Sequence, residues 1–400
     1  MSGLTRTSAG TGPDPDTRSG PGAATDGEAV GTAPMAVADF AAVAQRVLPA
    51  EVWDFIAGGS GAELTLAANR AALDRIGLVP RVLAGASGCD TEAALPGAPT
   101  AAMPVAVAPM AYQQLAHEDG ELATARAAAA AGVPFALSML SSRPIESVTA
   151  LGGITWFQLY CLRDRGATAE LVVRAEEAGC AALVVTVDVP RMARRLRDLR
   201  NGFALPTDVA AANLDPASVA ETHDRRPGVS AVAEHTARAF AAGLSWDDIS
   251  MLRERTRLPL IVKGLLDPRD AALAADLGAD AVVVSNHGGR QLDSAVAAVD
   301  MLPAVREATP ARCRVLLDSG VRGGTDVLKA LVLGASGVLL GRPALWGLAA
   351  GGEAGVRQVL DLLAVELRSA LELAGCADLD AVRLLTARVP DARTYGGGVR

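Results

Sequence analysis

The chain is poor in cysteine, and its few cysteines are scattered. Its 400 residues include five cysteines, an odd number, and no two of them form a C-x-x-C pair. Disulfide frameworks and metal sites usually show paired or clustered cysteines. We therefore expect neither of these and a reducing, cytoplasmic location. The cysteines are Cys89, Cys161, Cys180, Cys313 and Cys376.

The sequence also lacks a basic excess and a long apolar run. Lysine and arginine together number 37 against 45 acidic residues, which gives a net charge of −8. This balance provides no general electrostatic attraction for nucleic acid. No segment reaches the roughly 18 consecutive apolar residues typical of a membrane helix, although half of all residues are hydrophobic. We expect a large buried core and neither nucleic-acid nor membrane partners.

The two ends of the chain lack the patterns of folded elements. Residues 1–35 are rich in Gly, Ala, Ser, Thr, Pro and Asp without periodicity, which predicts a disordered arm. The arm lacks the basic start and apolar core of a secretion signal. We expect one folded domain over residues 36–390 and a tail over 391–400. The domain should begin with helices at Ala38–Val47, Ala50–Ala57 and Glu63–Arg75.

Eight apolar runs, each ending in polar or glycine-containing sequence, are spaced along the rest of the chain. Most are separated by helical patterns such as Thr168–Ala178 and Asp270–Leu277. Eight strand and helix repeats predict an α/β fold, the (β/α)8 TIM barrel, in which functional groups lie at the carboxyl ends of the strands. The runs are Val105–Met110, Pro134–Met139, Thr155–Tyr160, Ala182–Asp188, Pro259–Gly264, Ala281–Asn286, Val315–Gly320 and Gly337–Arg342.

The connection between the fourth and fifth runs, Val189–Leu258, is much longer than usual. Long insertions at this end of a barrel commonly form active-site lids. Its middle is polar and interrupted by Pro206, Pro216 and Pro227. It therefore lacks the amphipathic stretch of a membrane anchor.

A histidine and an arginine follow the sixth run, in the segment Ser285–Asp293 (SNHGGRQLD). His287 can accept a proton near neutral pH, and Arg290 can hold a carboxylate through two hydrogen bonds. A single histidine at a strand end is more often a satisfied polar residue, and paired glycines often only form turns. The barrel context favours proton abstraction from a small carboxylic acid.

Glycines and arginines also end the seventh and eighth runs, in Asp318–Gly324 and Gly341–Pro343. Glycine lets backbone N–H groups approach an anion, and barrels commonly bind phosphate at these two strands. The alternative is two ordinary turns with solvent-facing arginines. We favour one phosphate site, and no G-x-G-x-x-G dinucleotide pattern is present.

Lysine is rare: the chain has only Lys263 and Lys329. Lys263 ends the fifth run, where its ammonium group could stabilise negative charge on a ring, form a Schiff base as in a lysine aldolase, or make a plain salt bridge. A phosphate-binding isomerase is a further alternative.

Taken together, these motifs resemble the FMN-dependent α-hydroxy-acid oxidase and dehydrogenase family, the glycolate oxidase group, over about residues 37–385. Within it, the segments 55–61 and 194–203 resemble the 4-hydroxymandelate oxidases. The resemblance implies an FMN cofactor and a homo-oligomer, a tetramer in this family. The shared segments are 108–111, 120–121, 156–160, 186–190, 194–195, 262–264, 285–293 and 318–342.

The resemblance also implies a role for each site residue. His287 would be the base and Asp188 its charged partner, while Arg290 and Arg195 would bind the substrate carboxylate. Tyr160 would bind the substrate oxygen, and Lys263 would lie by the flavin. The residues expected to contact FMN are Pro109, Met110, Ala111, Ser138, Gln158, Thr186, Lys263, Ser285, Asp318, Ser319, Gly320, Arg322, Gly341 and Arg342.

Two positions depart from the family pattern. Phe55 replaces a tyrosine that helps to bind the substrate carboxylate, which favours an aromatic substrate, and Ser319 replaces the usual glycine. We therefore expect oxidation of an (S)-2-hydroxy acid, mandelate or 4-hydroxymandelate, to the 2-oxo acid, with O2 reduced to H2O2. An aliphatic acid such as lactate or glycolate, and a flavin-binding module without turnover, are the alternatives.

Overall fold

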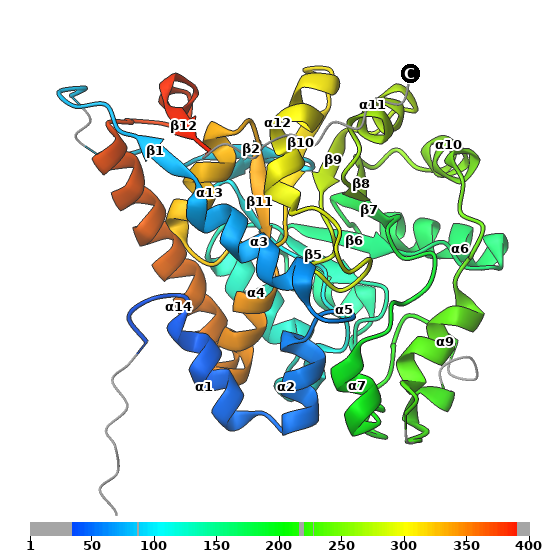
Figure 1. Cartoon of the computed structure of the whole chain (residues 1–400). Helices are drawn as coiled ribbons and strands as arrows, with labels where there is room; N and C mark the ends of the chain where they lie inside the picture. Colours follow the sequence, from blue (N-terminus) through cyan, green and yellow to red (C-terminus); the bar gives the residue numbers. More distant parts are fainter. Residues whose placement is uncertain (1–33, 86–87, 216–219, 227, 390–400) are drawn as a thin grey trace, which may run out of the picture. The chain divides into compact units, whose positions relative to one another are not determined.

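Eight parallel strands follow one another and close into a barrel (Figure 1). The computed structural model describes residues 34–85, 88–215, 220–226 and 228–389. The strands keep their sequence order around the barrel, and the last pairs with the first, which confirms the predicted (β/α)8 barrel. They are β4 (Val105–Val107), β5 (Phe135–Ser138), β6 (Thr155–Leu159), β7 (Ala182–Thr186), β8 (Leu260–Leu265), β9 (Ala281–Val284), β10 (Arg314–Leu317) and β11 (Gly337–Leu340).

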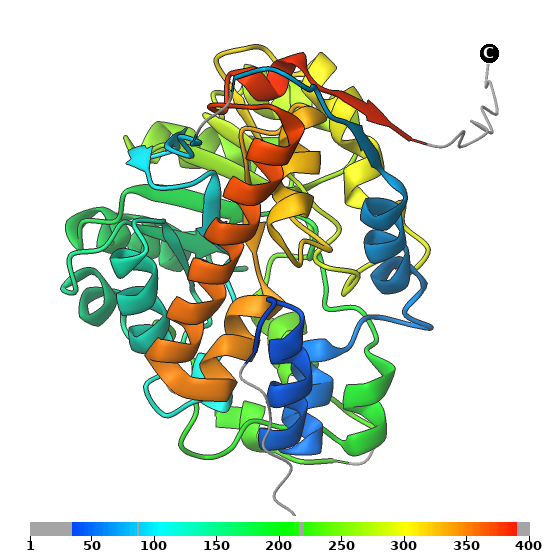
Figure 2. The same cartoon turned by 90° about the vertical axis from the view of Figure 1, so that its left-hand side faces the viewer.

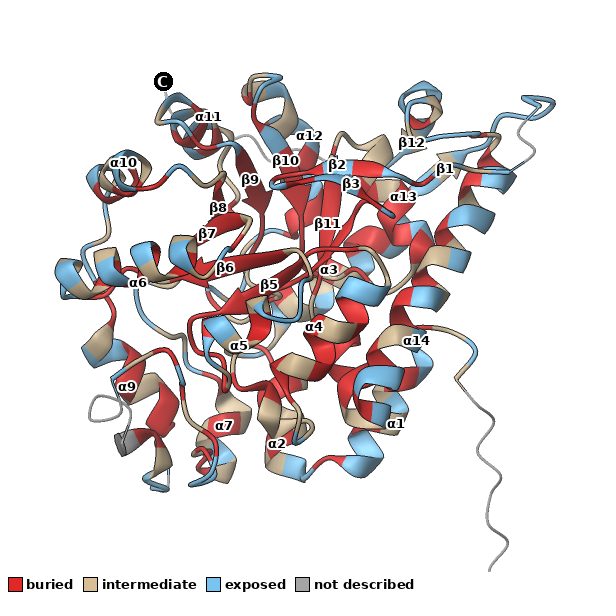
Figure 3. Ribbon diagram, turned by 180° about the vertical axis from the view of Figure 1, so that it is seen from behind, coloured by how far each residue is buried: buried red, intermediate tan, exposed pale blue. Residues whose placement is uncertain are grey.

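The strands are buried on both faces, because side chains alternate between the barrel interior and the surrounding helices. In β7, Ala182 and Val184 belong to one buried cluster, whereas Leu183 and Val185 belong to the other. Figure 3 shows the strands buried and the outer faces of many helices exposed. The near-continuous apolar runs in the sequence reflect this double burial.

A hairpin covers the amino-terminal ends of the barrel strands. It consists of β2 (Ala93–Leu95) and β3 (Ala98–Ala101). A Cβ added at Gly337, where β11 begins, would lie 2.8 Å from Leu95 Cδ2, and one at Gly97 would lie 2.1 Å from the carbonyl oxygen of Ala181, before β7. A substrate must therefore enter from the carboxyl ends.

Helices follow most strands and form the outer layer. The last, α14 (Arg342–Ala374), is interrupted by non-helical backbone at Gly351 and Gly352 and packs against α4, α13 and the N-terminal α1 (Figure 2). The others of this layer are α4 (Glu121–Ala130), α5 (Ile145–Thr149), α6 (Arg165–Glu177), α10 (Trp246–Arg255), α11 (Pro268–Asp276), α12 (Ala298–Ala308) and α13 (Gly324–Val332), with the 3-10 turns η1 (Gln113–Leu115) and η3 (Ala381–Leu384).

Three helices precede the barrel, as predicted: α1 (Asp39–Val47), α2 (Ala50–Ala57) and α3 (Leu64–Arg75). The pair β1 (Gly77–Val79) and β12 (Thr386–Arg388) then joins the start of the domain to its end. Of the predicted arm, residues 1–33 lie outside the described part of the chain, as does the tail at 391–400.

The long connection after β7 contains α7 (Leu196–Asn201), η2 (Ala220–His223) and α9 (Ala231–Ala239). It packs on the N-terminal segment, because α7 contacts α2 and the Gly61 N–H donates to the Arg194 carbonyl. Met192, Arg195 and Val232 of this connection line the principal pocket. Among the described residues, no helix is long and apolar enough to cross a membrane.

Candidate active site

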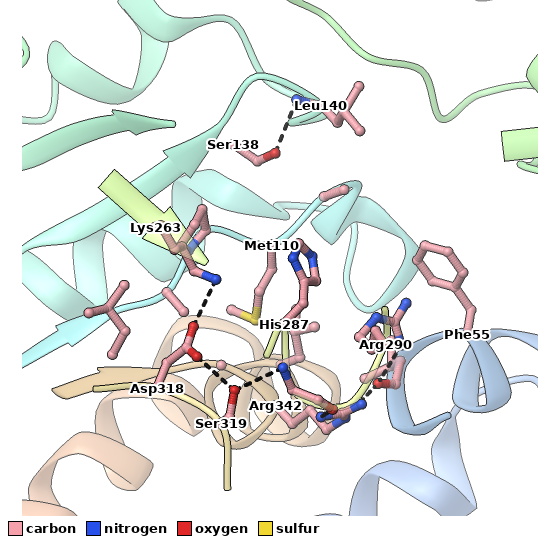
Figure 4. A pocket seen from close by; sticks show the side chains of 18 of the residues that line it. Phe55, Met110, Ser138, Leu140, Lys263, His287, Arg290, Asp318, Ser319 and Arg342 are labelled. Carbon is pink, nitrogen blue, oxygen red and sulfur yellow. Dashed lines mark hydrogen bonds and ion pairs between the residues drawn. The ribbon is translucent and has the colours of Figure 1, made fainter. Parts of the chain in front are cut away.

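The principal pocket opens at the carboxyl ends of the barrel strands, where the sequence placed the functional groups (Figure 4). Each of the eight barrel strands, or the segment that follows it, contributes to the lining. The sequence-predicted residues that line it are Phe55, Pro109, Met110, Ala111, Ser138, Tyr160, Arg195, Lys263, His287, Arg290, Asp318, Ser319, Gly320, Arg322, Gly341 and Arg342.

Asp188 follows β7 and His287 follows β9, the strands on either side of β8, and the two side chains form a hydrogen-bonded pair. His287 Nδ1 lies 3.0 Å from Asp188 Oδ1. If Nδ1 carries the hydrogen, Nε2 is free to accept a proton. Burial lowers the pKa of His287 despite the opposing charge of Asp188, so the ring is neutral at pH 7. Glycine at position 264 leaves room for Asp188, because a Cβ added there would lie only 2.6 Å from Asp188 Cβ.

Lys263 forms a buried ion pair with Asp318, 2.8 Å from Nζ to Oδ2 (Figure 4). Burial opposes the charge of Lys263, but Asp318 and Asp188 raise its pKa overall. Burial likewise opposes the charge of Asp318, whose pKa is nevertheless lowered by Lys263. Lys263 is therefore protonated, which is the wrong state for a Schiff-base nucleophile. This geometry argues against the aldolase alternative.

Four arginines line the pocket, Arg195 buried and Arg290, Arg322 and Arg342 half-buried, and none forms a salt bridge with a described residue. Burial and neighbouring arginines lower the pKa of Arg342 to about 9 and that of Arg290 well below its usual range. Burial and Arg70 lower the pKa of Arg322 to about 10. Burial also lowers the pKa of Arg195. Cations that are partly or fully withdrawn from solvent and lack counter-ions favour the binding of anions.

The four arginines come from different segments around the pocket. Arg195 and Arg290 flank Phe55, with guanidinium carbons 5.8 and 5.3 Å from its ring centre. Arg322 and Arg342 instead follow β10 and β11, at the predicted phosphate turns. Arg290 and Arg342 both donate to the Gly58 carbonyl, each at 2.8 Å, so the two pairs of arginines approach each other there.

The pocket and the side chains directly behind its lining fit a flavin mononucleotide. Gln158 accepts a hydrogen bond from Ser138 through Oε1, but its buried Nε2 has no partner among the described residues. A Cβ added at Gly341 would meet nothing closer than 3.9 Å, so this turn is open toward the pocket. A ring with hydrogen-bond acceptors and a terminal phosphate matches the unpaired amide and the arginines.

Three of the residues predicted to contact flavin do not line the pocket. Gln158, Thr186 and Ser285 are buried at the ends of their strands. Ser285 accepts hydrogen bonds from Lys263 Nζ at 3.1 Å and from the His287 N–H at 3.0 Å. It thereby orients two groups of the site.

Some site residues were not predicted from the sequence. Asn69 in α3 exchanges two side-chain hydrogen bonds with Asn286, of 2.8 and 2.7 Å, and so anchors the histidine segment. Arg70 donates to the Gly320 carbonyl at 2.7 Å. Neither contact leaves a signal in the sequence, since each joins positions more than 200 residues apart. Tyr112 also lines the pocket, and its place directly after Pro109–Ala111 could have indicated this.

Residues 44–387 match the FMN-dependent dehydrogenase family. The chain belongs to this family. It is 53% identical to the 4-hydroxymandelate oxidase of Amycolatopsis orientalis over 89% of this chain and 98% of that protein. It is 45% identical to the L-lactate oxidase of a Nostoc species, over 88% and 97% of the two chains. A crystal structure of mandelate oxidase with (S)-4-hydroxymandelic acid superposes with a TM-score of 0.87 at 52% identity, covering 89% of this chain and 99% of that one.

Family membership confirms the resemblance, the FMN cofactor and the hydroxy-acid oxidase class predicted from the sequence. It also decides against the aldolase and isomerase alternatives. Relatives named for hydroxymandelate, lactate and glycolate all match along most of their length. The choice among such acids must therefore come from the pocket of this chain.

Proposed function

We propose that this protein oxidises an aromatic (S)-2-hydroxy acid, mandelate or 4-hydroxymandelate, to the 2-oxo acid. The observation that carries the proposal is the wall beside the carboxylate site. The Phe55 ring stacks on Phe203, with ring centres 4.5 Å apart and planes 11° apart, between α2 and the end of α7. Phe55 cannot donate a hydrogen bond to a carboxylate but can pack against an aryl ring. An aliphatic acid such as lactate or glycolate would leave this surface without a contact.

In this proposal, Arg290 and Arg195 bind the substrate carboxylate and so fix the α-carbon near His287. Burial, reinforced by the charge of Asp188, raises the pKa of Tyr160 to about 12. Its hydroxyl therefore stays protonated and can donate to the substrate oxygen. His287 takes a proton at Nε2, and Asp188 stabilises the resulting imidazolium.

Bound FMN supplies the acceptor for the two electrons that leave the substrate. We propose that Pro109, Met110, Ala111, Ser138 and Gln158 contact its ring, together with Thr186 and Ser285. Lys263 would place positive charge beside the ring. Asp318 would bind the ribityl chain, because a carboxylate retains acceptor capacity beyond its bonds to Lys263 and Ser319. Gly320, Arg322, Gly341 and Arg342 would bind the phosphate.

We propose O2 as the electron acceptor, with H2O2 as product. Relatives that match this chain are named as oxidases of 4-hydroxymandelate, lactate and glycolate, which supports this proposal. We also propose a cytoplasmic location, from the scattered cysteines, and a homotetramer, from the family resemblance.

The proposal is tested by stopped-flow reduction of the flavin under anaerobic conditions with (S)-mandelate, 4-hydroxymandelate, (S)-lactate and glycolate. The aromatic acids should give the higher ratio of reduction rate to dissociation constant. Faster reduction by glycolate than by mandelate would overturn the aromatic assignment. Oxygen consumption without matching H2O2 would overturn the oxidase assignment.

A further inference from the structure

Ser319 follows β10 in a backbone conformation that favours glycine. Its φ is +74°, in the left-handed region that side chains other than glycine rarely adopt. Its hydroxyl donates to Asp318 Oδ1 at 2.7 Å. It also accepts from the N–H groups of Asn286, at 3.3 Å, and Gly288, at 3.0 Å. One donor and two acceptor positions are the whole capacity of a hydroxyl, and all three are used.

The segment that Ser319 holds is the one that carries His287. Residues 287, 288 and 289 have φ values of +58°, +65° and +74°, so three consecutive residues are left-handed. Such backbone persists only where its surroundings fix it. Ser319 accepts from the amides on either side of His287, and Ser285 accepts from the His287 amide itself. Without Ser319, two of these three donors lose their partner.

The same hydroxyl reaches the cofactor side of the pocket. Asp318 Oδ1 accepts from Ser319, while Oδ2 pairs with Lys263 (Figure 4). Ser319 therefore links the histidine segment to the buried ion pair. The hydrogen bonds of its hydroxyl all go to these two groups.

We infer that Ser319 is a positioning residue for His287: its hydroxyl fixes the segment 286–288, which includes the left-handed residues His287 and Gly288, on the turn after β10 and so holds the imidazole at its reacting position. The expected effect on the reduction rate rests on the proposed function. The hydrogen bonds between Ser319 and the histidine segment do not depend on that function.

The test compares Ser319→Gly and Ser319→Ala in the FMN-loaded protein. Both variants remove the hydroxyl, but only glycine relieves the backbone strain. Ser294→Gly is the matched control, because Ser294 has a similar φ of +68° and is exposed in the loop that follows the histidine segment. No hydrogen bond of its hydroxyl is found among the described residues.

The first measurement is anaerobic flavin reduction by (S)-mandelate. Both Ser319 variants should lower the limiting reduction rate roughly tenfold, because small displacements of a reacting group cost one to two orders of magnitude. The dissociation constant of the substrate should change less than about twofold, since Arg195 and Arg290 do not contact Ser319. Ser294→Gly should behave as wild type.

The second measurement is hydrogen exchange of the amides at 286 and 288. Both Ser319 variants should exchange faster there than wild type and the Ser294 control, because their N–H groups have lost an acceptor. This readout does not depend on turnover.

Several results would overturn the inference. One is that Ser319→Gly reduces its flavin at the wild-type rate while Ser319→Ala is slow. The slow rate would then come from backbone strain at position 319 and not from loss of the hydroxyl. Another is FMN loss with normal reduction of the loaded fraction, which would make Ser319 a cofactor contact. If no 2-hydroxy acid reduces the wild type, the proposed function fails instead. The hydrogen-exchange measurement then decides alone. Unchanged exchange of the amides at 286 and 288 in the Ser319 variants would overturn the positioning role, and faster exchange would support it.

Discussion

Replacing His287 with asparagine should separate binding from chemistry. Asparagine can still donate a hydrogen bond to Asp188 Oδ1, which His287 Nδ1 approaches to 3.0 Å, but it cannot accept the substrate's proton. Removal of a general base typically costs about 10²–10⁴-fold in rate, or about 3–5 kcal/mol of transition-state stabilisation. The phosphate-site arginines and the Lys263 pair remain in place, so FMN content should not change.

The assay is the limiting rate of anaerobic flavin reduction at saturating (S)-mandelate. Asp188→Asn should also be slow, because it removes the charge that stabilises the imidazolium. Since the two residues act as a unit, the double variant should be no slower than His287→Asn alone. Reduction of His287→Asn at the wild-type rate would refute the role of His287 as base. Additive losses in the double variant would refute the pairing.

Four further outcomes follow from the site. Arg342→Ala should weaken FMN binding about 10–100-fold, by loss of a charge-assisted contact, as measured by flavin fluorescence titration; unchanged affinity would place the phosphate elsewhere. The reduction rate should fall at low pH with a midpoint below 6.5, the ordinary pKa of histidine, because burial lowers the pKa of His287 and the neutral ring is the active form; a midpoint at or above 6.5 would contradict this. Phe55→Tyr should narrow the preference for mandelate over glycolate, and a widened preference would count against the aromatic wall. Gly289→Ala should lower the free energy of unfolding by about 1–2 kcal/mol or more, as measured by denaturant titration, because φ is +74° and the new Cβ would lie 2.5 Å from Leu66 N; unchanged stability would contradict this.

The barrel and the place of the site were predictable because both depend on local patterns. Double burial makes each parallel strand a continuous apolar run, and polar residues such as His287 and Asp318 directly follow the runs. The predicted positions of the helix starts were less accurate. The helix predicted at Thr168–Ala178 begins at Arg165, because the Asp164 side chain accepts from two N–H groups of its first turn. Likewise, α11 begins at Pro268 after the capping Asp267.

The contacts that shape the pocket were not predictable from local pattern, because they join distant segments. Arg342 donates to the carbonyls of Ile56 and Gly58, 286 and 284 residues away along the chain. The pairing of Asn69 with Asn286 depends on how α3 lies on the closed barrel. The opposite charges of Lys263 and Asp318 were visible in the sequence. Their pairing was not, because it depends on the closed barrel, which brings Lys263 in β8 close to Asp318 after β10, with β9 between the two strands.

The most direct test of the account is the visible spectrum of the purified protein, recorded before and after anaerobic addition of (S)-mandelate. We predict a yellow protein from which denaturation releases FMN, and loss of the flavin absorbance on addition of the acid, followed by its return with H2O2 formation when air is admitted. A colourless protein that does not take up FMN, or bound FMN that no 2-hydroxy acid reduces, would contradict it.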